Sequence, residues 1–158
     1  MKTGGEFEGI GAYLLMYQGR LAEVRATVEH VKVDHFPPRY RGMIEAMRVI
    51  DTDPARALAA MDEAEAVYRD PEAVFLMVFV SAVLGVHDRA MTQVDEAVAA
   101  GFTPVHALEN APVLATLRGR PQFQAVLDRA RQRQKIALAI FERGDGPALL
   151  GIPAAQAT

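Results

Sequence analysis

The chain has 158 residues, which is enough for one domain with a buried core. Apolar residues make up 51% of it, which excludes a disordered chain, and its 17 basic and 20 acidic residues give no general attraction to nucleic acid. The absence of cysteine excludes disulfides, thiolate metal sites and cysteine nucleophiles.

The N-terminal part predicts two helices joined by a tight turn. The start, MKTGGEFEG, has one lysine followed by glycines and acidic residues, so we expect no signal peptide. A helix is predicted over residues 9–17, and Gly19 follows it as a breaker. After Gly19, the apolar residues Val24, Val28 and Val31 are spaced by four and three, which places them on one face of a second helix.

The same arrangement recurs twice along the chain. The stretch TDPARALAAMDEA begins at Thr52, and the similar stretch GVHDRAMTQVDEA begins at Gly85, which is 33 residues later. Thr52 itself lies 33 residues after Gly19. Small or apolar residues stand at the offsets of the first stripe: Ala57, Met61 and Ala64, then Ala90, Val94 and Ala97. A fixed interval of this length is typical of a repeat array, so three second helices are expected to share one buried stripe.

A first helix is predicted before each later turn, over residues 39–50 and 72–84. Asp53 and Asp70 each stand directly before a proline, as capping residues do at a helix start. Gly101 is a stop signal after the third pair. The unit is therefore helix, tight turn, helix.

The most apolar segment covers residues 73–86. Its 14 residues are fewer than the roughly 18–20 needed to cross a bilayer, so we expect a buried core helix and no membrane span. The single serine of the chain, Ser81, lies inside it. We expect its hydroxyl to bond to the carbonyl one turn earlier, because no His or Asp lies within a turn to activate it.

The pattern changes after Pro104. Short helical pieces are predicted over residues 104–110 and 112–117, followed by a long helix from Pro121 to about Arg143. The apolar stripe of the long helix consists of Phe123, Val126, Leu127 and Ala130. Its basic residues are Arg129, Arg131, Arg133 and Lys135. We interpret this basic run as a solvated capping face, because no aromatic residues are interleaved to stack bases.

Helix pairs of about 34 residues are the pattern of the tetratricopeptide (TPR) repeat, and the chain resembles that family over roughly residues 5–100. The resemblance rests on the three turns, the three stripes and Pro71. The chain departs from the family in lacking tryptophan and a Leu-Gly pair in its first helices, in the bulk of Val24, and in a late Pro71. Residues 117–123, with Leu117-Arg118 and Pro121-Gln122-Phe123, resemble the closing segment of bacterial TPR proteins.

The resemblance implies an all-α, right-handed helical-repeat solenoid with about three helix pairs and a C-terminal capping helix. Over residues 5–103 we expect three repeats, at about 5–36, 37–70 and 71–103. Capping helices at 104–147 and a tail at 148–158 belong to the same single domain. Such a cap is also what a repeat array needs, because its last unit must present a polar outer face.

In arrays of this family the first helices line a concave groove. By register, the groove residues here are Ile10, Tyr13, Tyr17, Arg39, Met43, Ala46, Phe75, Leu76 and Phe79. This apolar and aromatic groove predicts a non-enzymatic interaction module that binds an amphipathic or hydrophobic segment of a protein or peptide. Three alternatives stay open: the cap or tail fills the groove, the groove packs a homodimer, or the chain is a regulatory or sensing domain for a small apolar ligand.

No pattern of residues predicts catalysis, a cofactor or a metal. The four histidines are His30, His35, His87 and His106. The spacing of His30 and His35 matches no established ligand pattern, and a local hydrogen bond with Asp88 would account for His87. We therefore expect no catalytic, cofactor-binding or metal-binding residues. We also expect no nucleic-acid partner and a cytoplasmic location.

Overall fold

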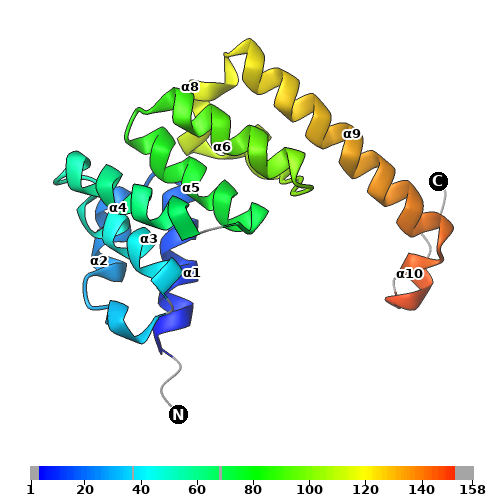
Figure 1. Ribbon diagram of the computed structural model, residues 1–158. Coiled ribbons are helices and arrows are strands. Elements are labelled where there is room, and N and C mark those ends of the chain that lie inside the picture. Colours follow the sequence, from blue (N-terminus) through cyan, green and yellow to red (C-terminus); the bar gives the residue numbers. More distant parts are fainter. Residues whose placement is uncertain (1–3, 37, 68, 152–158) are drawn as a thin grey trace.

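A computed structural model describes residues 4–36, 38–67 and 69–151, and within these ranges the chain is all-α, with no strand (Figure 1). The expected all-α class is thereby confirmed. Three helix pairs come first: α1 (Gly4–Tyr17) with α2 (Leu21–Val28), α3 (Pro38–Val49) with α4 (Pro54–Val67), and α5 (Pro71–Val83) with α6 (His87–Ala99). A short 3-10 turn, η1 (Val33–His35), lies between the first two pairs.

The C-terminal part consists of short helices and one long one. After α6 come α7 (Val105–Asn110), η2 (Pro112–Leu114), α8 (Ala115–Arg118), α9 (Pro121–Arg143) and α10 (Gly146–Leu149). Helix α9 packs on α6, α7 and α8 and then extends away from the body, with α10 folded back against its far end (Figure 1). The long helix was expected, whereas α10 was not.

The turns expected at Gly19, Thr52 and Gly85 are present between the helices of each pair. Gly19 has a φ of 75° and Gly85 a φ of 73°, a left-handed conformation that favours glycine. At both turns the glycine N–H donates to the carbonyl three residues earlier, and the next N–H donates to the carbonyl five residues earlier, which is a Schellman motif. Thr52 closes its turn differently, because its N–H and that of Asp53 both donate to the Val49 carbonyl.

Helix α5 is the buried helix that its apolar sequence predicts. Residues 77–82 are all buried, and the helix contacts α1, α3, α4, α6 and η2. Asp70 caps its N-terminus as expected, since its carboxylate accepts the N–H groups of Glu72 and Ala73 at 3.0 and 3.1 Å.

The prediction for Ser81 is wrong, because its hydroxyl bonds to another helix. Ser81 Oγ donates to Gln93 Oε1 on α6 at 2.8 Å, and both side chains are buried. Gln93 Nε2 donates in turn to Glu65 Oε1 on α4 at 2.7 Å, and Arg89 joins Glu65 to Asp62 with contacts of 2.6 and 2.7 Å. This polar chain connects α4, α5 and α6.

Several arginines close the C-terminal ends of helices on other elements. Arg48 on α3 donates to the Val28 carbonyl at the end of α2, and Arg118 donates to the Leu108 carbonyl near the end of α7, both at 3.1 Å. Arg133 on α9 donates to the Val98 and Ala99 carbonyls at the end of α6. These guanidinium groups donate to carbonyls of the last helical turn, for which the helix itself provides no i+4 N–H partner.

Helices α3 and α4 approach each other closely at Gly42. A Cβ atom at Gly42 would lie 2.5 Å from the Ala60 carbonyl oxygen and 3.0 Å from the Ala64 Cβ. A Cβ atom at Gly11, in α1, would meet nothing within 4 Å. Only the absence of a side chain at residue 42 allows the second pair to pack at this distance.

These two glycines give a matched test of the packing. A Gly→Ala change in a helix interior raises the free energy of unfolding by roughly 0.5–1 kcal/mol, because alanine loses less conformational entropy on folding. We expect Gly11→Ala to raise the free energy of unfolding by about that amount, whereas Gly42→Ala should lower it by roughly 1–3 kcal/mol through overpacking. Urea denaturation followed by circular dichroism measures both. Equal effects of the two substitutions would contradict the close approach.

Candidate functional site

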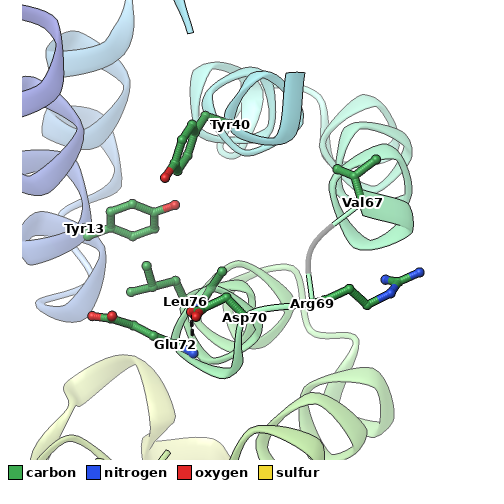
Figure 2. A pocket seen from close by; sticks show the side chains of 8 residues that line it. Tyr13, Tyr40, Val67, Arg69, Asp70, Glu72 and Leu76 are labelled. Carbon is green, nitrogen blue, oxygen red and sulfur yellow. Dashed lines mark hydrogen bonds between the residues drawn. The ribbon is translucent and has the colours of Figure 1, made fainter. Parts of the chain in front are cut away.

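The candidate site is a cavity of about 500 Å³ between the first helices of the three pairs. It is lined by Tyr13 of α1, Tyr40 of α3, Val67 at the end of α4, Arg69 and Asp70 of the following connection, and Glu72, Ala73 and Leu76 of α5. Tyr13 and Tyr40 point toward the space between α1, α3 and α5, with Leu76 facing them (Figure 2). The pocket thus brings together side chains that are far apart in the sequence.

Two charged residues at the rim of the pocket, Asp70 and Arg69, form hydrogen bonds with the ends of neighbouring helices. The Asp70 carboxylate caps α5, so its oxygen is occupied by backbone N–H groups. Arg69 donates to the Glu65 and Ala66 carbonyls at 3.0 and 3.1 Å, which closes the end of α4, and its guanidinium points away from the two tyrosines (Figure 2). Both residues therefore hold the α4–α5 connection in place around the pocket.

The remaining lining combines phenol rings, aliphatic surface and one carboxylate. Tyr40, Val67 and Glu72 are exposed, while Tyr13 and Leu76 are half-buried, so the pocket is open to solvent. Tyrosine combines a large apolar contact area with a polar hydroxyl, a combination that is enriched in protein interfaces. The described residues contain no group of three or more His, Asp or Glu side chains placed to hold a metal ion.

The structure places the predicted groove residues in three different settings. Tyr13 and Leu76 line the pocket. Tyr17 is half-buried and packs edge to face on Phe79, with ring centroids 6.1 Å apart. Ile10 lies in α1 and Arg39 in α3, but their side chains are outside the described part of the structure.

The remaining four predicted groove residues are core residues, which corrects the prediction. Met43, Ala46, Phe75 and Phe79 are each at most 4% exposed and offer no surface to a partner. Met43 and Ala46 belong to α3, which packs on α2, α4 and α5. Phe75 and Phe79 pack on each other, and their further ring contacts are Phe102 and Tyr17. Neighbouring elements of the same chain therefore cover this part of the expected groove.

Sequence reasoning missed Tyr40, Val67, Arg69, Asp70, Glu72 and Ala73 as pocket residues. Tyr40 directly follows Arg39, so a shift of one residue in the assumed helical register would have found it. Most of the others belong to the α4–α5 connection or to the first turn of α5. The breaker signal at Asp70 marks this connection, but no local pattern shows that it borders a cavity.

The basic run of α9 lies against other helices. Arg129 pairs with Asp95 of α6, and Arg131 pairs with Glu109 of α7 at 2.7 Å. The hydrogen bond from Arg131 to the Glu109 carboxylate raises the pKa of this guanidinium above its ordinary value. These pairs agree with a capping role for the run, since its charges hold α9 on α6 and α7.

His87 has a different partner from the one expected. Its Nδ1 lies 3.2 Å from an Arg120 guanidinium nitrogen, and Arg120 also pairs with Asp88 at 2.9 Å. Arg120 stands directly before α9, so the two contacts fasten the start of the long helix to the start of α6.

Comparison with known proteins gives no relative: no protein-family model matches the chain, and neither does any curated protein or solved structure. The resemblance to the TPR family therefore rests on the quoted residues alone. Among the described residues, no helix has both the length and the apolar character needed to cross a membrane.

The burial of Phe79 leads to a direct prediction. Truncating a core phenylalanine costs roughly 3–5 kcal/mol, so Phe79→Ala should lower the free energy of unfolding by about that amount. Leu14→Ala is the control, because Leu14 is 62% exposed and its truncation should change the free energy of unfolding little. Chemical denaturation measures both. A Phe79→Ala variant as stable as the Leu14→Ala variant would contradict the burial of Phe79 and indicate that it lies at the groove surface.

Proposed function

We propose that the protein is a non-enzymatic interaction module that binds a segment of a protein or peptide partner in the pocket between α1, α3 and α5. The three helix pairs are proposed to form a right-handed, TPR-like superhelix, with the first helices on its concave face. The observation that carries the proposal is the open cavity of about 500 Å³ on the side formed by these first helices. A cytoplasmic location is part of the proposal and fits a chain without cysteine.

The lining favours a peptide over an enclosed small molecule. Most of its residues are exposed, whereas pockets that bind small ligands typically bury most of the ligand surface. The tyrosine rings and Leu76 supply an apolar floor for one side chain of the partner. The Glu72 carboxylate at the rim favours a segment with a basic residue beside the apolar one.

Selection of a peptide library on the immobilised protein provides the probe. We expect selected peptides to bind wild type with measurable affinity in calorimetry, and Tyr40→Ala to weaken that binding at least tenfold, because aromatic anchors dominate interface energies. Tyr40 is 38% exposed and packs edge to face on Phe36, so the substitution should lower the thermal midpoint, and binding is measured at a temperature at which wild type and variant are both folded.

Leu14→Ala is the matched control, since it removes an exposed apolar side chain of α1 that does not line the pocket. It should leave peptide affinity unchanged. The proposal is wrong if no peptide is selected, or if the selected peptides bind Tyr40→Ala as tightly as wild type. A small apolar ligand that stabilises wild type but not Tyr40→Ala would instead indicate the sensing function.

A further inference from the structure

The distal half of α9 is an apolar surface that the body of the protein leaves uncovered. Its proximal half is anchored by buried side chains, ending with Ala130, but every residue from 131 to 145 is exposed. In Figure 1 this half extends beyond the helix pairs, and among the elements that the structure describes α10 lies beside its far end. The segment is therefore held in place at one end and available for contact along its length.

This exposed half contains six consecutive apolar residues, 136–141, with the sequence IALAIF. Ile136, Leu138 and Ile140 are 50, 54 and 57% exposed, and Leu149 of α10 is 80% exposed. Helix segments that are apolar on nearly every side are normally buried, and an exposed apolar run of this length indicates an interaction surface.

The charges around this run suit a second copy of the same helix. Lys135 precedes Leu138 by three residues and Glu142 follows it by four, so the three share one face of α9. If two copies pair antiparallel about Leu138, Lys135 of each copy lies opposite Glu142 of the other. The face is thus complementary to itself in this orientation, whereas a parallel pair would place like charges together.

We propose that α9 and α10 form a homodimer interface, in which the segment 136–141 of two copies packs antiparallel about Leu138. The interface is separate from the pocket between α1, α3 and α5, so each copy keeps its pocket. The dimer would therefore present two peptide sites, one from each copy.

Light scattering and sedimentation of the full chain test the proposal. We expect wild type to have twice the monomer mass of 17.2 kDa at micromolar concentrations, and Leu138→Lys to be monomeric with an unchanged helical spectrum, because residue 138 is exposed in one copy. Leu14→Lys is the control on α1 and should remain dimeric. A wild type that is monomeric at all concentrations overturns the proposal, as does a dimer that tolerates Leu138→Lys.

A charge exchange tests the orientation. Lys135→Glu and Glu142→Lys should each raise the dimer Kd by about tenfold, because each replaces two attractive contacts by two repulsive ones. The double variant restores opposite charges across the antiparallel pair and should return the Kd close to that of wild type. A double variant that dimerises no better than the single variants would contradict the antiparallel pairing.

Discussion

The burial of α5 on all sides is the constraint on which the rest of the structure depends. Removing an apolar side chain from water is favourable whatever its neighbour, so a helix with apolar residues around its whole circumference must be enclosed. Here α1, α3, α4, α6 and η2 supply that enclosure. The C-terminal part packs back on α5 through η2, Phe102 packs on Phe75, and the open site lies at the end of α5 near Asp70.

Apolar burial alone does not fix how neighbouring helices are aligned, because the hydrophobic effect is non-directional. Hydrogen bonds are directional, and those from Ser81 to Gln93 and from Gln93 to Glu65 fix the alignment. A buried hydroxyl or amide that loses its partner costs roughly 1–3 kcal/mol, so any sliding or rotation of α6 against α4 and α5 is penalised. The one hydroxyl in the most apolar helix thereby selects a single arrangement of three helices.

Local signals predicted most of the helices but only part of the site. Gly19 and Gly85 mark turns because a left-handed φ is a local requirement, and Asp70 caps a helix through its own next residues. Phe79 belongs to the core because Tyr17 of α1 packs on it, and no spacing within α5 encodes that contact. The packing of α1 against α5 and of α3 against α5 also brings Tyr13 and Tyr40 to one pocket, which no spacing within either helix encodes. The solvent-exposed course of α9 beyond Ala130 is likewise a tertiary result, because its sequence alone reads as a continuous helix.

The contact of α1 with α5 and η2 changes how such an array would lose its structure. In an open stack each repeat touches only its neighbours, so end units can fray one at a time while the middle stays folded. Here the first pair also touches the third pair and the cap, and its detachment would expose the apolar helix that all of them enclose. Amide protons of α1, α3 and α5 should therefore exchange with solvent in one cooperative opening, whereas those of the distal turns of α9 are not coupled to it within a single copy.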